Sequence, residues 1–272
     1  MKIFLRFTIV LIPLLFMSHI VNGGGGWPEE KGGYFAKFGQ YGIYSKYNFG
    51  PGGEVLDLYS PVSYYATTVY GSYGITDKLT GIVNLPIYAR ATLHATDLNE
   101  KQVVQSVGDT DIALKYNFLA KNGWVASAQL TAGLPLGKSG NVQTGDGEFN
   151  QMIEFIASKG LNNGYYSFQA GFNNRTSGFV DEVRWGIEGG LKKGNFWGIL
   201  RVLGVNPLRN QGNPQVETVG LFGNNVKYLA VSPEISYSVS EKWGFSVGAG
   251  FAAYGENILA SPTFNAGIFI KG

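Results

Sequence analysis

The sequence predicts an all-β fold, a transmembrane antiparallel β-barrel of about twelve strands with short turns on one side and longer loops on the other. Three observations predict it. Polar turn residues recur at regular intervals, apolar and polar side chains alternate between the turns, and aromatic residues gather beside the short turns. The composition agrees, because the chain has 40 glycines among 272 residues and only 15% charged residues. Soluble domains average about 7% glycine and about 25% charged residues.

The first 23 residues have the pattern of a signal peptide. Lys2 and Arg6 form a short basic region, an apolar stretch runs from Phe7 to Val21, and small residues near Gly23 suit a cleavage site. A membrane anchor is the alternative, but the stretch is short and Pro13 interrupts it. The sequence therefore indicates an exported protein.

Three parts are expected in the chain: a signal peptide (1–23), a short N-terminal periplasmic segment (24–32) and the transmembrane barrel (33–272). Without the signal peptide the protein has 19 basic and 19 acidic residues, so its net charge is zero. This balance lacks the excess of basic residues that is typical of nucleic-acid-binding proteins. No later stretch has the 18 or so consecutive apolar residues of a membrane helix. An exported chain of this kind is a soluble β-protein or a closed barrel in the cell outer membrane of a Gram-negative bacterium.

The turns predict the strand number. Each short turn carries Asp, Asn, Gly or Lys, as tight hairpins need. The five short turns lie at 76–78, 120–123, 161–164, 193–195 and 240–242. The six longer connections centre on 50–53, 97–108, 137–147, 174–181, 206–225 and 255–261. Eleven connections give twelve strands, and an even number places both termini on the short-turn side, which is the periplasm in outer-membrane barrels.

Alternation of side chains supports strands between these turns. From Asp109 to Phe118, Ile112 and Leu114 fall on one face, opposite Asp111 and Lys115. A soluble β-sandwich fits that alternation equally well, with its apolar face inward. Aromatic placement favours the barrel, since a membrane interface attracts aromatic side chains to one edge. The expected periplasmic aromatic belt is Trp124, Tyr166, Trp197 and Trp243.

Several motifs resemble a known family. They are GDTDIALKY (108–116), YGITDKL (73–79), GLPLG with TGDGEFNQ (133–137 and 144–151), FNNRTSGFVDE (172–182) and LFGNNVKYL (221–229). The chain resembles the outer-membrane proteins of the MetA-pathway of phenol degradation family, in the FadL-like group. The resemblance implies a porin-like transporter of small hydrophobic or aromatic solutes. It departs from FadL-like channels at residues 24–32, which are too few for a folded hatch, and in lacking a C-terminal aromatic residue, for which Phe269 is a near substitute.

If the apolar faces meet lipid, the polar faces line the lumen. The lumen-lining candidates are Arg90, Asp111, Lys115, Glu154, Arg175, Arg184, Glu188, Arg201 and Glu234. Because acids and bases are mixed, a paired network that holds the interior together is favoured over a constriction that selects solutes, and the two roles are compatible. The glycine-rich loop 137–147 is the candidate for a loop that folds into the lumen.

No catalytic, cofactor or metal site is expected. Asp109, Asp111, Asp146 and Glu148 lack the ligand spacing of a calcium site. His94 is the only histidine of the mature chain, and counting by twos places it on the lumen side with Arg90. A lipid hydrolase needs a Ser–His pair on the lipid face and is therefore the least favoured function. The alternative to a channel is a structural or surface-interaction barrel without transport. The expected partners are outer-membrane lipid, small solutes and the barrel-assembly machinery during biogenesis, with no nucleic acid.

Overall fold

The computed structural model describes residues 25–97, 100–208 and 222–272. The predicted signal peptide lies outside these residues. Within them there is no helix, so none that could cross a membrane. All regular structure in the described chain is β, as predicted.

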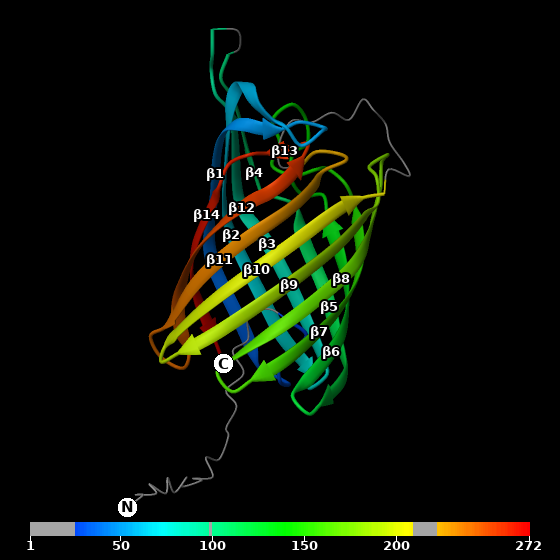
Figure 1. Cartoon of the computed structure of the whole chain (residues 1–272), viewed down its shortest axis with the longest axis vertical. Coiled ribbons are helices and arrows are strands. Elements are labelled where there is room, and N and C mark those ends of the chain that lie inside the picture. Colours follow the sequence, from blue (N-terminus) through cyan, green and yellow to red (C-terminus); the bar gives the residue numbers. More distant parts are fainter. Residues whose placement is uncertain (1–24, 98–99, 209–221) are drawn as a thin grey trace, which may run out of the picture.

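Twelve long antiparallel strands form one closed barrel (Figure 1). They are β1 (Tyr34–Phe49), β2 (Val55–Thr76), β3 (Leu79–Leu93), β5 (Thr110–Lys121), β6 (Trp124–Leu134), β7 (Asn150–Leu161), β8 (Gly164–Arg175), β9 (Glu182–Lys193), β10 (Phe196–Pro207), β11 (Lys227–Ser238), β12 (Trp243–Glu256) and β14 (Thr263–Lys271). Each pairs with its neighbours in the chain, and β1 closes the sheet by pairing with both β2 and β14. The short strands β4 (Gln102–Ser106) and β13 (Ile258–Leu259) extend the β3 and β1 edges beyond the barrel wall.

The connections have the predicted distribution. All five short turns lie at the end where the C-terminus lies (Figure 1), and the longer loops lie at the other end. The turn between β5 and β6 shows the cause, since Asn122 and Gly123 have φ of 54° and 75°. Positive φ at both central residues is what a two-residue hairpin requires. The number of strands predicted from the turns is therefore confirmed.

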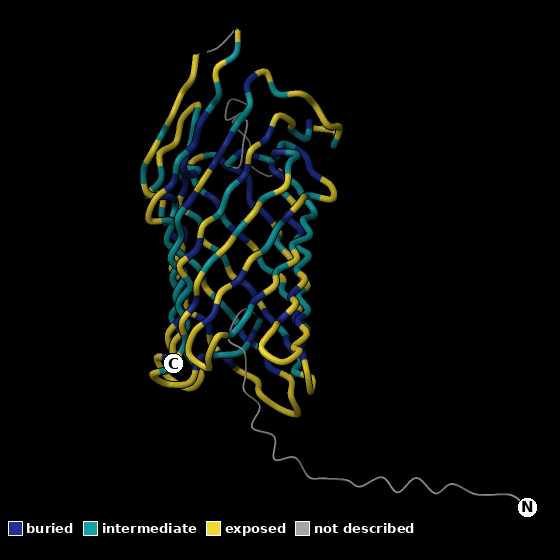
Figure 2. The backbone as a smooth tube through the Cα atoms, turned by 90° about the vertical axis from the view of Figure 1, so that its left-hand side faces the viewer, coloured by how far each residue is buried: buried dark blue, intermediate teal, exposed yellow. Residues whose placement is uncertain are grey.

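The apolar faces of the strands point outward. In β5, Ile112, Leu114 and Tyr116 are about half exposed, while Ala113 and Lys115 between them are buried. Figure 2 shows the same alternation of buried and exposed residues along the strands. A soluble sandwich would bury its apolar face. An outward apolar wall is the arrangement of a barrel in lipid.

Candidate functional site

An ion network crosses the barrel interior between β1 and the neighbouring strands β9, β10 and β11. The Lys37 ammonium of β1 lies 3.3 Å from Glu234 of β11, and Arg201 of β10 lies 3.3 Å from the same carboxylate oxygen. Arg201 also pairs with Glu188 of β9, which accepts a 2.5 Å hydrogen bond from the Tyr165 hydroxyl. Two cations and two carboxylates are thus joined in one network, as the mixed charges of the sequence predicted for a paired interior.

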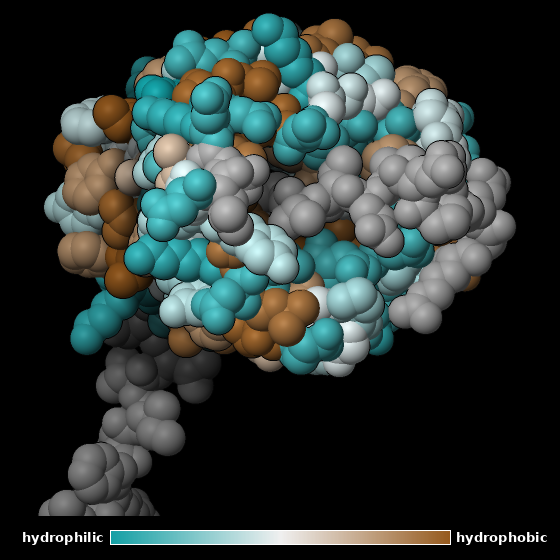
Figure 3. Space-filling view, turned by 90° about the horizontal axis from the view of Figure 1, so that it is seen from above, coloured by the Kyte–Doolittle hydropathy of each residue, from teal (hydrophilic) through white to brown (hydrophobic). Residues whose placement is uncertain are grey.

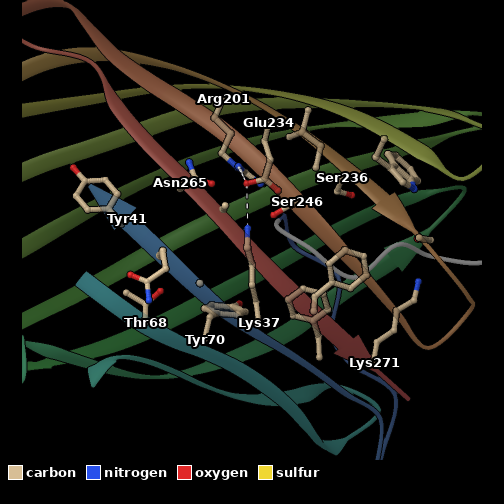
Figure 4. A pocket seen from close by; sticks show the side chains of 18 residues that line it. Lys37, Tyr41, Thr68, Tyr70, Arg201, Glu234, Ser236, Ser246, Asn265 and Lys271 are labelled. Atoms are coloured by element: carbon tan, nitrogen blue, oxygen red, sulfur yellow. Dashed lines mark hydrogen bonds and ion pairs between the residues drawn. The ribbon is translucent and has the colours of Figure 1, made fainter. Parts of the chain in front are cut away.

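A cavity of about 480 Å³ lies beside this network (Figure 4). Aromatic and aliphatic side chains form much of its wall, namely Phe35, Tyr70, Trp197, Ile199 and Phe269. Lys37, Arg201, Glu234 and Lys271 supply its charged groups. Its size falls in the range of small-molecule pockets, about 300 to 1,000 Å³, and such pockets combine apolar walls with a few polar groups in the same way.

Small residues create this hollow. The inward positions Ser236, Ser246, Gly267 and Gly39 stand opposite one another on successive strands β11, β12, β14 and β1. A methyl group at Gly267 would lie 2.9 Å from Cε of Lys37. Because Gly39, Ser236 and Ser246 of the cavity lining carry small side chains or none, the wall recedes between the ion network and the aromatic residues.

The N-terminal segment 25–31 enters the short-turn end of the barrel. The Gly25 carbonyl accepts a 3.2 Å hydrogen bond from Lys115, and the Gly26 amide donates to Ser158 at 2.8 Å. The Glu29 carboxylate accepts from Ser72 at 2.7 Å. Burial raises the pKa of Glu29, although this hydrogen bond and the charge of Lys115 oppose the shift. The segment is too short to fold as a separate hatch, yet it lies against the inner wall.

Trp27 of this segment reaches the cavity wall. Its ring meets Tyr165 edge-on, with centroids 5.4 Å apart. Tyr165, Trp197 and Ile199 form a buried cluster against which Trp27 packs. Since Trp197 and Ile199 also line the cavity, the N-terminal segment narrows the lumen on the short-turn side of the cavity.

A second apolar cluster narrows the lumen toward the long loops. It consists of Ile43, Tyr64, Ala66, Ala89, Ala91 and Leu259. Tyr41, which lines the cavity, packs against it, as do Val142 and Phe222 from two loops. The inward position of Val142 confirms that loop 137–147 folds into the barrel mouth. Figure 3 shows this end from above, with many hydrophilic side chains around hydrophobic ones.

Asp109 anchors that inward loop. Its carboxylate accepts hydrogen bonds from the Gly137 amide at 2.8 Å and the Asp146 amide at 2.6 Å. Burial raises the pKa of Asp109 to about 6, and the nearby Asp146 charge also raises it, while the amide of Gly137 lowers it. The carboxylate therefore holds both ends of the loop. Among the described residues, no group of three acidic, histidine or cysteine side chains could hold a metal ion.

A second ion network lies near the inward loop. Arg175 pairs with Asp146 at 3.0 Å and with Glu182 at 2.9 Å, and Arg184 pairs with the other oxygen of Glu182 at 2.8 Å. Two of the nine lumen-lining candidates therefore belong to this network, while Glu188, Arg201 and Glu234 belong to the central one.

Three further candidates lie on the inner wall. Lys115 contacts the N-terminal segment. Glu154 of β7 accepts a 3.5 Å hydrogen bond from Gln129 of β6. Asp111 of β5 stands directly opposite Asn84 of β3.

Arg90 lies on the outer face, so its predicted inward orientation is wrong. Strand β3 has a bulge in which Ile87 is an extra residue between the pairs Thr67–Tyr88 and Thr68–Pro86. The extra residue reverses the alternation. Beyond it Ala89 and Ala91 face the interior, and Arg90 stands opposite the exposed Tyr65.

The same reversal of alternation places His94 on the outer face instead of in the lumen. His94 Nε2 lies 3.0 Å from Ser63 Oγ, and its ring packs edge-on against Tyr44. Tyr44 and Ser63 stand opposite each other on the outer face of β1 and β2, so the expected lumen position of His94 is wrong. Ser63 is only 3% exposed, and no carboxylate of the described residues hydrogen bonds to the imidazole. The pair therefore lacks the oriented and accessible nucleophile of a hydrolase.

The aromatic belt has three of its four predicted members on the outer face. Trp124 and Trp243 are about 40% exposed, and Tyr166 packs edge-on against Trp124. The prediction for Trp197 is wrong, because this side chain is 6% exposed and faces the cavity. Its neighbour Phe196 takes the outer position and packs on Tyr237.

The closed wall, apolar outside and charged within, defines a twelve-stranded barrel of the outer-membrane type. Solved structures agree with this fold. The COG4313 outer membrane channel from Pseudomonas putida F1 is similar with a TM-score of 0.67 at 12% identity, over 93% of this chain and 100% of that one. The NanC porin has a TM-score of 0.53 at 7% identity, over 88% and 100%. The KdgM porin in complex with disordered oligogalacturonate has 0.52 at 4%, over 87% and 98%. No protein-family model matches the chain, and no curated protein sequence matches it.

Proposed function

We propose that this protein is an outer-membrane channel for small hydrophobic or aromatic solutes, and a relative of the MetA-pathway of phenol degradation family. One observation carries the proposal: an amphipathic cavity of about 480 Å³ lies inside a barrel whose outer wall is apolar. The similarity to solved outer-membrane channels and porins supports it. In this proposal the barrel-assembly machinery inserts the chain into outer-membrane lipid after signal-peptide cleavage near Gly23.

The lumen is narrowed at both ends of the cavity, which favours a selective path over a wide pore. The N-terminal segment lies below it and the apolar cluster above it, and both touch residues of its wall. Twelve strands lie between the filled eight-stranded barrel and the open sixteen-stranded porin. A solute would therefore contact the cavity wall as it crosses.

The test is conductance of the purified mature chain in planar bilayers. The wild type should give discrete current steps. Gly267→Leu places its Cβ 2.9 Å from both Lys37 Cε and the Phe38 carbonyl oxygen, so it displaces Lys37 or the β1 backbone and should reduce the step by half or more. Gly198→Leu is the matched control, since a Cβ at this outward position meets nothing within 4 Å, and it should leave the step unchanged.

Ser236→Leu provides a second obstruction at the cavity wall should Gly267→Leu fail to fold. If both cavity variants fold and conduct like the wild type, the cavity does not lie on the path. Complete electrical silence of the wild type, with no solute flux into liposomes, would favour a structural or surface-interaction barrel instead.

A further inference from the structure

The cavity wall holds two hydrogen-bond donors without partners. Trp197 Nε1 and Ser246 Oγ are buried, and neither has a hydrogen-bond partner in the described chain. Both residues line the cavity. A buried donor left unpaired is unfavourable, so an acceptor oxygen supplied by a bound solute would stabilise the complex.

Lys271 adds a positive charge without a matching acid. The central network joins two cations to two carboxylates. Lys271 also lines the cavity, and none of the described carboxylates lies within 4.0 Å of its ammonium. Lys192 repels this ammonium, and Glu241 and Glu29 attract it, only over a longer range. The cavity therefore carries one surplus positive charge.

An aromatic surface separates the ammonium from the donors. On β14 the inward residues in order are Gly267, Phe269 and Lys271, and Gly267 stands directly opposite Ser246. Phe269 stacks on Phe35, with ring centroids 5.7 Å apart. Figure 4 shows Ser246 and Lys271 apart along the same wall.

We propose that the cavity binds small aromatic carboxylates, with the carboxylate at Lys271, the ring on Phe269 and a second oxygen at Ser246 and Trp197. Opposite charges attract more strongly in a site partly shielded from water, and the stacked rings favour a planar apolar body. This inference rests on the proposed function, because it names the solute class that the channel would admit.

Binding of 4-hydroxybenzoate to the detergent-solubilised mature protein, measured by isothermal titration calorimetry, tests the charge. The wild type should bind it at least about tenfold more tightly than neutral 4-hydroxybenzyl alcohol, which corresponds to about 1.4 kcal/mol. Lys271→Met should abolish this preference without changing the affinity for the alcohol, and Lys271→Arg should retain it. Lys193→Met, at an exposed position in the β9–β10 hairpin, is the matched control and should behave like the wild type.

The donors are tested by comparing 4-hydroxybenzoate with benzoate. Trp197→Phe keeps a ring but removes the N–H, and Ser246→Ala removes the hydroxyl. Each should reduce the advantage of 4-hydroxybenzoate over benzoate about threefold or more. The shift of gel mobility on heating identifies variants that have not folded. If a variant fails this check, the test rests on the affinities of the wild type and of Lys271→Arg for the acid and the alcohol.

Equal affinity of the wild type for the acid and the alcohol would overturn the inference, as would an unchanged preference in folded Lys271→Met. The outcome is separable from the proposed function. Conductance without preferential acid binding defeats the inference alone, whereas preferential acid binding in an electrically silent barrel defeats the channel and leaves the binding site.

Discussion

Burial should decide how much each arginine of the Glu182 network stabilises the barrel. Arg175 and Arg184 bind opposite oxygens of the same carboxylate at 2.9 Å and 2.8 Å. Their side chains are 4% and 41% exposed, respectively. Removing one partner of a buried ion pair costs about 3–5 kcal/mol, because an uncompensated charge stays behind. Exposed pairs contribute about 0–1 kcal/mol.

Arg175→Met leaves Asp146 without its arginine, while Glu182 keeps Arg184. We therefore expect Arg175→Met to lower the free energy of unfolding by about 3 kcal/mol, the lower end of the buried range. Arg184→Met should lower it by about 1 kcal/mol or less. The measurement is equilibrium urea unfolding in detergent micelles, followed by tryptophan fluorescence.

The double variant Arg175→Met with Asp146→Asn supplies the control, because it removes the stranded charge together with the arginine. It should recover part of the loss. If Arg175→Met costs no more than Arg184→Met, burial does not control these ion pairs, and the reasoning fails.

Three further predictions concern the belt, the N-terminal segment and the inward loop. Lipids brominated near the interface should quench the tryptophan fluorescence of variants that keep only Trp124 or Trp243. A variant that keeps only Trp197 should resist quenching, and equal quenching of all three variants would contradict the inward position of Trp197. Deleting residues 25–31 after the signal peptide should enlarge the conductance step, and an unchanged step would show that the segment does not narrow the path. The pKa of Asp109 is raised from 3.8 to about 6, so its stabilising contribution is full below about pH 4 and is lost as the pH rises through 6. Asp109→Asn should flatten the pH dependence of urea unfolding in that window; an unchanged profile would assign it to another group.

The turns allowed the strand number to be predicted because tight hairpins restrict composition locally. Asn122 and Gly123 have the positive φ angles that their turn requires, and the sequence displays this need directly. Orientation could be predicted equally well where strands are regular, as for Lys115 and Ile112. Both features depend on neighbours in the chain.

Orientation could not be predicted beyond a bulge. Ile87 is one inserted residue, and nothing in its side chain distinguishes it from a regular strand residue. Every inward or outward assignment between it and His94 is reversed, and for this reason Arg90 and His94 were misplaced. A bulge is defined by the pairing of two strands, so one strand read alone does not reveal it.

The error at Trp197 had a different origin, and the sequence held the signal that corrects it. Its place after a short turn suggested the membrane interface. However, Trp197 is four residues before Arg201, and an even spacing along a strand puts two side chains on the same face. The alternation of side chains along the strand, and not the distance from the turn, decides which residue faces the lipid. Phe196 therefore occupies the outer position. The N-terminal segment offered no comparable signal, since many of its contacts join backbone groups to distant side chains such as Lys115 and Ser158.

Selection of solutes by a narrow barrel would depend on where its inner wall is recessed. The interior carries ion pairs where long side chains meet, as at Arg201 and Glu188, and a hollow where Gly39 and Gly267 stand opposite each other. Paired charges offer little to an incoming ion, because each already has a partner. The hollow instead offers aromatic rings, unpaired donors and one unmatched ammonium. In the proposed channel a solute would therefore be distinguished by how well it fits the cavity wall, and the proposed site would prefer anions because its charge is local to the cavity.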